Sequence, residues 1–512
     1  MRSTTRAGSG VLATGMAVVL LSTSASAAPG PGAPGAGDVY YPGAGNGGYD
    51  VSHYDVRLTY QPDTDELAGT TTILANTTQE LSSFNLDFGL KVNSVRVNNV
   101  PADFANDAAD PSELVVTPKN ALAADQFLTI AVEYADTPSK VEIDGLTAWK
   151  KTPDGALAVD EPTSSEWWFP ANDHPTDKAT YDVSVEVPDD AAAISNGNLV
   201  RKTKQREGWT RWNWRSTQPQ ATYLTFLAVG AFEVLESTTP DGQPFITAYD
   251  PTLGPNLPAA KGSIERTPEA VEFLETAFGP YPFEAQGGVA TPHLGFALEN
   301  QTRSVYDGEF FKSGTNMSVV IHENAHQWFG DSVSLGQWRD IWLNEGFATY
   351  AEFLWSEHAG EGTADELAEY LYNSYPADDP FWQVLPGDPG AENQFDGAVY
   401  DRGALAVHAL RKAVGEEAFF EILKTWQEQK KGGHATLDEF IALSEKISGK
   451  PLFDLYQTWL FTKGRPSASP NGQPSAVSAA NVARAADGAP AEPKSYPRMR
   501  STHALLGAHH GH

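Results

Sequence analysis

The chain has 512 residues, 41% of them hydrophobic and 11% aromatic, which is enough for two or three domains with hydrophobic cores. Its formal net charge of −31 argues against a protein that binds nucleic acid. The absence of cysteine excludes disulfides and thiol chemistry.

Residues 1–28 have the pattern of a secretory signal peptide. A positively charged N-terminal region with Arg2 and Arg6 precedes an apolar segment from Val11 to Leu21. Ala25-Ser26-Ala27 supplies a cleavage site of small residues. A membrane anchor is the alternative, but Gly15 interrupts the apolar segment, which is too short to span a bilayer. We therefore expect cleavage near Ala27 or Ala28 and a soluble extracellular protein, because no later segment has membrane-spanning length.

The next part of the chain indicates a β-rich domain. Residues 29–48 are rich in glycine and proline, and we expect a flexible leader there. Over residues 49–236, short runs such as 54–60 and 181–187 alternate between apolar and polar residues, and turn-forming clusters separate them. The alternation predicts an N-terminal antiparallel β-domain.

After Glu236 the periodicity becomes helical, and residues 237–465 are expected to form a mostly helical catalytic domain, so the predicted fold class is multidomain α+β. Residues 466–512 are rich in alanine, proline, serine and glycine without periodic apolar faces, and they are predicted to be a disordered tail. The histidines of this tail could bind a metal weakly, but a polar tail without a metal is favoured. These histidines are His503, His509, His510 and His512.

Several helices of the second domain are predicted individually. Thr267 is expected to cap the first, and Thr363 and Glu366 have capping-box spacing before the fourth. The predicted helices are residues 268–278, a metal-binding helix that ends at Gly330, and residues 343–358, 364–372, 403–414, 417–429 and 437–448.

The central motif lies in residues 319–352. His322, Glu323 and His326 form an H-E-x-x-H pattern, and histidines four positions apart lie one turn above each other on a helix, where both can reach one metal ion. Glu345, with 18 residues between it and His326, is the candidate third ligand. A lone histidine is more often a surface or core residue and a lone Glu345 a solvated charge, but their combination favours a metal site.

This ligand set has a definite chemistry. Two imidazoles and one carboxylate are typical of zinc with one position left open for water, although manganese or cobalt could occupy it in vitro. Zinc would lower the pKa of that water and polarise a carbonyl. Glu323 is placed to take the water's proton and deliver it to a leaving amine. The motif predicts peptide-bond hydrolysis without a covalent intermediate.

Two residues outside the motif could assist it. Tyr400, just before the helix predicted from Gly403, could donate to the developing oxyanion, although a tyrosine there is more often a packing residue. Glu352, seven residues after Glu345 and near the same helical face, could orient a ligand imidazole. A solvated or salt-bridged Glu352 is an equal alternative.

Glu161 and Glu299 are two further carboxylates in apolar or aromatic surroundings. Glu161 precedes Trp167-Trp168-Phe169, and Glu299 follows Phe296-Ala297-Leu298. Buried carboxylates are costly unless paired. A cationic substrate group could be the partner, and an internal arginine or lysine is the default alternative.

Residues 322–330 and 342–348 resemble the metal segment of the aminopeptidase N and leukotriene-hydrolase family of zinc metallopeptidases, a gluzincin pattern. The resemblance covers roughly residues 49–465 and rests on several motifs in the family's order. It implies a thermolysin-like catalytic domain with one zinc ion held by His322, His326 and Glu345, and Glu323 as the general base.

Three other motifs extend the resemblance. The segment from Phe296 to Asn300 is similar to the family's Gly-Ala-Met-Glu-Asn motif, with phenylalanine for glycine and leucine for methionine. It implies that Glu299 binds the substrate's α-amino group and that Ala297 and Asn300 belong to the substrate-binding segment. Glu161-Pro162-Thr163 resembles the start of the Glu-Pro-Thr motif and implies a second amine-binding carboxylate at Glu161. Tyr400-Asp401-Arg402-Gly403 resembles Tyr-x-Lys-Gly and implies that Tyr400 is the transition-state donor.

The resemblance stops near Arg465, whereas family members usually continue into a large helical domain that covers the active site. It therefore implies a two-domain short form with a more open cleft. We expect a monomeric, secreted zinc aminopeptidase that acts on peptides with a free N-terminus and has no nucleic-acid or membrane partner.

Two other functions remain open. An endopeptidase with the same zinc chemistry would suit an open cleft, but Glu161 and Glu299 argue against it. A non-catalytic scaffold of the same fold would be expected to have lost the ligands, yet all are present. An epoxide hydrolase side activity occurs in this family, but no residue of this sequence points to it.

Overall fold

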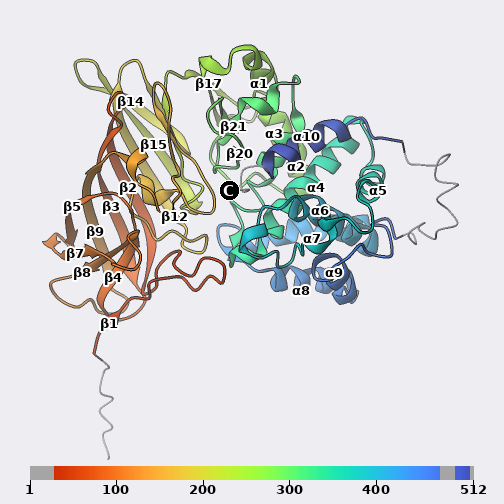
Figure 1. The fold of residues 1–512 in the computed structure, drawn as a ribbon, viewed down its shortest axis with the longest axis horizontal. Helices are drawn as coiled ribbons and strands as arrows, with labels where there is room; N and C mark the ends of the chain where they lie inside the picture. Colours follow the sequence, from red (N-terminus) through yellow and green to blue (C-terminus); the bar gives the residue numbers. More distant parts are fainter. Residues whose placement is uncertain (1–27, 144, 473–490, 508–512) are drawn as a thin grey trace, which may run out of the picture.

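The computed structural model describes residues 28–143, 145–472 and 491–507. Residues 1–27 of the predicted signal peptide, and residues 473–490 and 508–512 of the predicted tail, lie outside the described residues, and with them His509, His510 and His512. A β-rich N-terminal domain lies beside a mainly helical domain (Figure 1). This arrangement confirms the predicted fold class.

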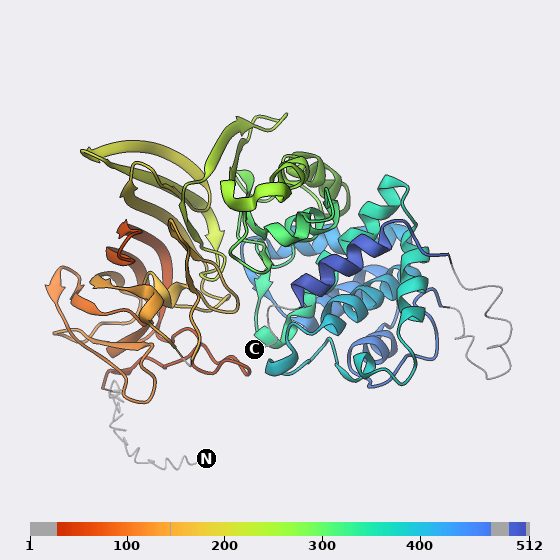
Figure 2. The same cartoon turned by 45° about the horizontal axis from the view of Figure 1, so that its top comes forward.

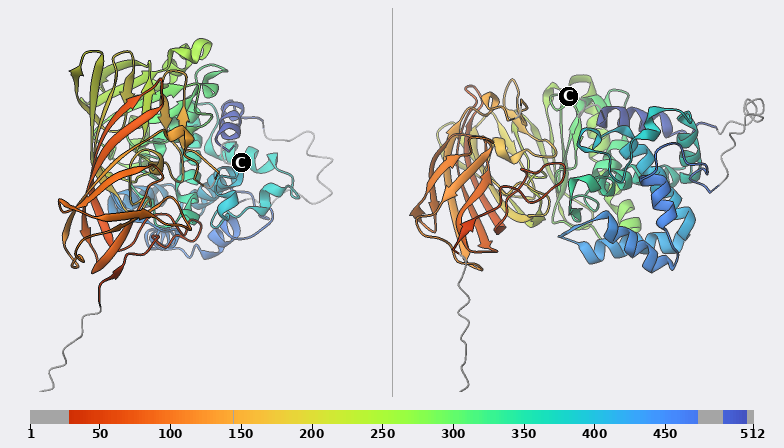
Figure 3. Two further views of the ribbon diagram at one scale, coloured as in Figure 1. Left: turned by 60° about the vertical axis from the view of Figure 1, so that its left-hand side comes forward. Right: turned by 60° about the horizontal axis from the view of Figure 1, so that its bottom comes forward.

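An eight-stranded sheet forms the body of the N-terminal domain (Figures 1 and 3). Its central strands, among them residues 49–61 and 179–188, alternate between more and less buried side chains, as the sequence predicts for a sheet with one face in a core. The pairing is antiparallel except between β2 and β12, which run parallel. In spatial order the strands are β14 (Asn198–Arg206), β15 (Trp209–Gln220), β12 (Ala179–Pro188), β2 (Tyr49–Gln61), β3 (Glu66–Thr77), β9 (Phe127–Asp136), β5 (Val92–Val97) and β6 (Val100–Pro101).

Two smaller sheets complete this domain. The first is ordered β1 (Gly30–Pro31), β4 (Leu81–Asp87), β8 (Glu113–Thr117) and β7 (Asp103–Asn106). The second is ordered β10 (Trp149–Lys151), β11 (Ala156–Ala158), β16 (Leu227–Gly230) and β13 (Ala192–Ile194).

The prediction of a flexible leader over residues 29–48 is wrong. β1 pairs with β4, and the buried Asp38 accepts a hydrogen bond from the backbone of Trp338 in the catalytic domain at 2.7 Å. The Tyr41 hydroxyl donates to Gln394 at 2.8 Å. Composition suggested flexibility because it does not show partners that lie about 300 residues away in the chain.

A five-stranded mixed sheet begins the catalytic domain, and the predicted boundary after Glu236 falls inside its first strand. Alternate side chains of this sheet enter different cores: Leu298 and Val305 pack with the N-terminal domain, whereas Ala297 and Tyr306 pack with the helices. In spatial order the strands are β17 (Glu233–Thr238), β18 (Pro244–Tyr249), β19 (Gln286–Thr291), β21 (Ser304–Asp307) and β20 (Ala297–Leu298). A separate pair joins β22 (Ser334–Leu335) to β23 (His434–Ala435).

The helices predicted in the catalytic domain are present. Thr363 and Glu366 form the predicted capping box, and Gly360 ends α4 in the left-handed conformation. Thr267 is the first residue of its helix and makes no cap bond, contrary to prediction. The helices are α1 (Leu257–Ile264), α2 (Thr267–Phe278), α3 (Met317–Ala325), α4 (Trp342–Ala359), α5 (Ala364–Ser374), α6 (Gly397–Val414), α7 (Glu416–Lys430), α8 (Leu437–Ser448), α9 (Phe453–Leu460) and α10 (Tyr496–Leu506).

The prediction of a disordered tail is wrong for residues 491–507. They include α10, which lies across the helices of the catalytic domain (Figure 2) and buries Tyr496, Met499, Thr502 and Leu506. The sequence pattern was weak because the buried face is half polar, with Thr502 and His503 between its apolar residues. Among the described helices, none combines the length and hydrophobicity needed to cross a membrane.

Candidate metal centre and active site

The two motif histidines are positioned by α3. Asn316 caps this helix, because its side chain accepts hydrogen bonds from the backbone N–H groups of Ser318 and Val319. The helix ends at Ala325, not at the predicted Gly330. His326 keeps helical dihedral angles at the cap, so it still lies one turn from His322, and the ring centroids are 4.9 Å apart.

Glu345 enters the site from the first turn of α4. Its Oε2 lies 3.3 Å from Nε2 of His322 and 3.5 Å from Nε2 of His326. The other nitrogen of each ring faces an acceptor: Nδ1 of His322 donates to Glu352 at 3.0 Å, and Nδ1 of His326 donates to the Phe329 carbonyl at 3.0 Å. Both rings therefore direct Nε2 toward Glu345, where it can bind a metal ion in place of a proton.

These three residues fit a zinc ion. Ligands about 2.0–2.1 Å from a tetrahedral zinc are separated from one another by about 3.3 Å, which matches the two distances from Glu345. The donor set of two imidazoles and one carboxylate is that of a hydrolytic zinc site. His322, His326 and Glu345 are all at least 97% buried, so few waters compete for the ligand atoms.

The electrostatics of the three ligands favour a bound cation. Burial opposes ionisation of Glu345, but the two imidazoles outweigh it and hold the pKa of this carboxyl at about 2. Burial likewise opposes charge on His322 and His326, yet Glu345 raises the pKa of both rings. The cluster thus attracts positive charge, which a metal ion can supply in place of protons.

Glu323 lies beside this cluster without being part of it. Its side chain is buried, and among the described residues its Oε1 has no hydrogen-bond partner. Burial raises its pKa to about 8. A buried carboxylate oxygen with no protein partner is suited to hold a water or a proton.

Glu161 and Glu299 face the same space from different domains. Glu161 follows β11 of the N-terminal domain, Glu299 follows β20, and both line a cavity with His322, Glu323 and Glu345. Oε1 of Glu161 has no hydrogen-bond partner among the described residues. Among the described residues, neither carboxylate forms an ion pair with an arginine or lysine. The internal arginine or lysine partner that the sequence left as the alternative is therefore absent from the described part of the chain.

Burial is the largest cause that raises the pKa of both carboxyls. Repulsion from Glu299 adds to the rise for Glu161, whereas for Glu299 repulsion from Glu345 adds to it and His326 opposes it. Oε1 of Glu299 accepts a hydrogen bond from Tyr223 at 3.3 Å. A cationic ligand would remove this cost for both carboxylates at once.

Tyr400 lines the same cavity from α6. The helix begins at Gly397, capped by Asp396, so Tyr400 lies in its first turn and not before it as predicted. Its ring stacks on His322 with centroids 5.9 Å apart. Burial and the surrounding carboxylates raise the pKa of the phenol well above its ordinary value, so the hydroxyl keeps its proton for donation.

The remaining predicted residues separate into two groups. Ala297 lines the cavity and Glu352 contacts His322, whereas Asn300 is fully buried and donates to the Leu224 carbonyl at 3.2 Å. Asn300 is not among the residues that line the cavity. Four consecutive residues from Phe296 to Glu299 line the cavity, and this lining ends before Asn300.

The sequence did not indicate four residues near the site: Tyr223, Asp331, His503 and Leu506. Tyr223 contacts Glu299, and the buried Asp331 follows the turn after α3. Leu506 of α10 lines the cavity, which has a volume of about 20 Å³. That is room for about one water molecule. Leu506 shows that α10 reaches this cavity, and the more open cleft stays a prediction.

Two family models match the chain. The peptidase M1 N-terminal domain matches residues 51–224, and the peptidase family M1 domain matches residues 263–459. Glutamyl aminopeptidase of Rattus norvegicus is 27% identical over 462 residues, which cover 82% of this chain and 48% of the rat protein. Aminopeptidase M1-B of Oryza sativa is 28% identical over 58% of this chain and 36% of its own length. The chain thus spans about half the length, or less, of these curated relatives.

Solved structures match over their full length. A mutant M1 zinc metallopeptidase from Deinococcus radiodurans is 30% identical, with a TM-score of 0.75, covering 86% of this chain and 100% of the other. A mutant of the Deinococcus radiodurans protein bound to a Tyr-Ser-Ala substrate is also 30% identical with a TM-score of 0.75, and the match covers 84% of this chain and 98% of the other. A two-domain M1 zinc metallopeptidase mutant bound to L-arginine is 29% identical with a TM-score of 0.76.

Proposed function

Because this chain belongs to the peptidase family M1, a family of zinc metallopeptidases, we propose that it is an aminopeptidase that hydrolyses the first peptide bond of peptides with a free N-terminus. One observation carries the proposal. Glu161 and Glu299 are buried in one cavity with the metal-ligand cluster, and neither forms an ion pair with an arginine or lysine among the described residues.

We expect substrate recognition to depend on the free-energy cost of burying Glu161 and Glu299 without a cationic partner. An ammonium group at the start of a peptide supplies a positive charge to both carboxylates and a hydrogen-bond donor to the unpartnered Oε1 of Glu161. A blocked N-terminus would leave them buried and unpaired. Discrimination of this kind, in which a polar site rejects a ligand that lacks the matching group, can be large. Fixing the ammonium also fixes the scissile bond one residue further along.

The metal ligands would be His322, His326 and Glu345, whose distances and donor types fit zinc. Zinc held there supplies Lewis-acid polarisation of the scissile carbonyl and activation of water. The Nδ1–H bonds to Glu352 and to the Phe329 carbonyl keep both imidazoles oriented for this role.

Glu323 and Tyr400 are the proposed catalytic residues. The free Oε1 of Glu323 takes a proton from the attacking water and then delivers it to the leaving amine. Its raised pKa suits the second transfer, and a divalent cation beside it favours the ionised form needed for the first. The protonated Tyr400 hydroxyl donates a hydrogen bond to the oxyanion that develops from the carbonyl.

Product analysis tests this proposal. A free-amine pentapeptide is incubated with the purified protein, with and without a chelator, and the products are identified by mass. We expect stepwise loss of N-terminal residues, which chelation abolishes and added zinc restores. Internal fragments would instead support an endopeptidase. No cleavage by zinc-loaded protein would support a non-catalytic scaffold.

We also propose export of the protein, on the basis of the pattern in residues 1–28. The N-terminal sequence of protein recovered from the culture medium checks it, and a new terminus near Ala28 is expected. Protein that stays inside the cell with residue 1 intact would contradict export.

A further inference from the structure

The C-terminal helix α10 reaches the elements that carry the catalytic residues. Thr502 accepts a hydrogen bond from Asn316, the cap of α3, at 3.0 Å. His503 contacts Glu352 on α4 and Asp401 on α6, and Leu506 lines the active-site cavity. α10 therefore joins three helices whose relative positions determine the geometry of the site.

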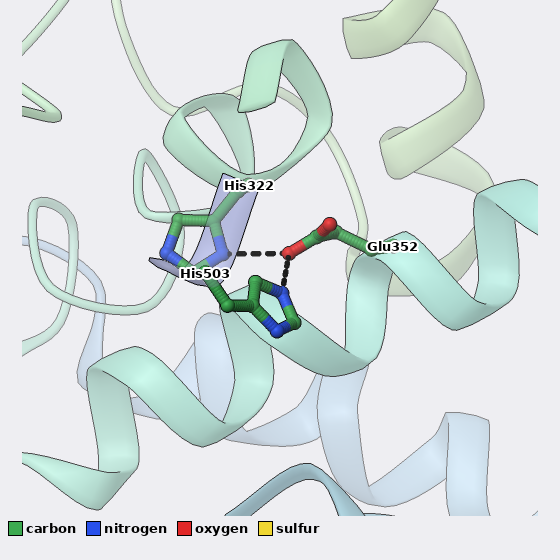
Figure 4. Close-up of side chains that lie close together, drawn as sticks. All are labelled: His322, Glu352 and His503. Atoms are coloured by element: carbon green, nitrogen blue, oxygen red, sulfur yellow. Dashed lines mark hydrogen bonds and ion pairs between the residues drawn. The ribbon is translucent and has the colours of Figure 1, made fainter. Parts of the chain in front are cut away.

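His503 lies at the centre of this contact (Figure 4). Its Nε2 is 2.8 Å from Oε1 of Glu352, and the same oxygen lies 3.0 Å from Nδ1 of His322. One carboxylate oxygen thus bridges a metal-ligand imidazole and the imidazole of α10. These distances are those of hydrogen bonds and are shorter than the separation of two ligands on one zinc ion, so this trio is not a second metal site.

The second ring nitrogen of His503 is also bonded to a carboxylate. Nδ1 lies 2.7 Å from Oδ1 of Asp401, whose Oδ2 accepts a hydrogen bond from the Tyr375 hydroxyl at 2.8 Å. Since carboxylates accept, the His503 ring donates from both nitrogens and is an imidazolium between two acids. Its side chain is 91% buried.

Both carboxylate oxygens of Glu352 accept hydrogen bonds, which fix the orientation of the side chain. Its Oε1 takes the two imidazole hydrogen bonds, and its Oε2 accepts one from the Ser318 hydroxyl of α3. Without His503 the carboxylate would lose its only described cationic partner apart from the metal-ligand ring, and could rotate away from His322.

We propose that His503 is a positioning residue of the catalytic centre: held between Glu352 and Asp401, it fixes the carboxylate that orients His322 and secures the turn of α6 that carries Tyr400. The proposal rests on the metal site of the proposed function and deepens it. According to this proposal, α10 contributes to the geometry of the active site, although the sequence predicts only a disordered tail in this stretch of the chain. His503 itself touches neither the cavity nor the reacting atoms.

The test compares His503→Ala with Ser501→Ala, a matched change on the exposed side of the same helix, where the hydroxyl donates only to the Arg498 carbonyl. Zinc affinity is measured on metal-free protein by competition with a chelator of known affinity, together with thermal unfolding. Loss of a group that is hydrogen-bonded to a metal ligand typically weakens metal binding by about 10- to 100-fold, and His503 is one contact further from the metal than Glu352. We therefore expect His503→Ala to weaken zinc binding by up to about 10-fold and Ser501→Ala to leave it unchanged.

A double-variant cycle shows whether His503 acts through Glu352. In a Glu352→Gln background, adding His503→Ala is expected to change zinc affinity by less than about 2-fold, because the two changes break the same link. In steady-state kinetics, His503→Ala should lower kcat more than it changes KM, since Glu161 and Glu299 are untouched. His503→Gln, which keeps one donor, should recover part of the affinity.

Two results would overturn the proposal: a folded His503→Ala protein with wild-type zinc affinity, or fully multiplicative losses in the double variant. If His503→Ala does not fold, His503→Gln decides, provided that its unfolding temperature matches that of Ser501→Ala. Wild-type protein that binds zinc but releases no N-terminal residue would contradict the proposed aminopeptidase and still leave the affinity comparison decisive for His503.

Discussion

Among single residues, Glu323 is the one on which hydrolysis should depend most, and it is not part of the cluster His322, His326 and Glu345 that could hold the metal. Glu323→Gln keeps the shape of the side chain but cannot accept the water's proton. We expect kcat to fall by about 10²- to 10⁴-fold with bound zinc unchanged. Metal analysis and steady-state kinetics on the same preparation check this, and His322→Ala serves as the contrast, because it should lose zinc as well. A Glu323→Gln enzyme with near wild-type kcat would remove Glu323 from the mechanism.

The residues of the metal site could be predicted because zinc chemistry constrains their types and spacing. His322, Glu323 and His326 lie within one helical turn, so the sequence itself brings them together. His503 could not be predicted in the same way. Its partners Glu352 and Asp401 lie 151 and 102 residues away, and only the packing of α10 brings the three together.

Among helices and strands, the cap of α3 is expected to affect both stability and the metal. Asn316→Ala removes the bonds to the first turn of α3 and the bond to Thr502, so we expect a loss of about 1 to 2 kcal/mol in the free energy of unfolding, together with weaker zinc binding. Thr436→Ala, which removes the capping box of α8 away from the site, is the control. It should cost about 1 kcal/mol and leave zinc affinity unchanged. If Asn316→Ala and Thr436→Ala bind zinc equally well, the prediction that the cap of α3 affects the metal site is wrong. Denaturant unfolding and chelator competition provide the two measurements.

Helix boundaries could be predicted where the local sequence determines them. The capping box at Thr363 and Glu366 forms as the spacing indicates. The start of α6 was placed too late because Gly403 resembles a helix boundary, whereas this glycine packs against Trp342 inside the helix, with no room for a larger side chain. Its proximity to α4, and not local conformation, explains that glycine.

For the whole molecule, stability should depend on pH through a carboxyl far from the metal. Burial raises the pKa of Glu113 from its ordinary value of 4.5 to about 7, even though Asn85 donates a hydrogen bond to it. The folded chain therefore holds this proton more tightly than the unfolded chain. The stabilisation is fully present below pH 4.5 and is lost as the pH rises through 7, by about 3 kcal/mol in total.

Glu113→Gln should remove that part of the pH dependence, since the amide stays neutral and can still accept from Asn85. Denaturant unfolding of the two proteins at pH 4.5, 6 and 8 makes the comparison. Wild type is expected to lose stability relative to the variant across this range. Parallel curves for the two proteins would contradict the assignment.

The two domains form one functional unit, which the sequence indicated only in part. Its alternation and periodicity predicted a β-domain followed by a helical one. The contacts that join them could not be seen in the sequence. Asp38 in a glycine- and proline-rich segment bonds to Trp338, and Leu298 of β20 and Val305 of β21 pack in the core of the N-terminal domain. The cavity depends on this union, since Glu161 comes from one domain and Glu299 from the other.

The cleavage of one peptide in its free and N-acetylated forms tests the central claim most directly. Both forms carry the same scissile bonds and differ only in the charge that Glu161 and Glu299 are proposed to bind. We predict release of the first residue from the free peptide, abolished by a chelator, and no measurable cleavage of the acetylated one. Comparable cleavage of both peptides would contradict the account, because the two buried carboxylates would then not select the substrate's amine.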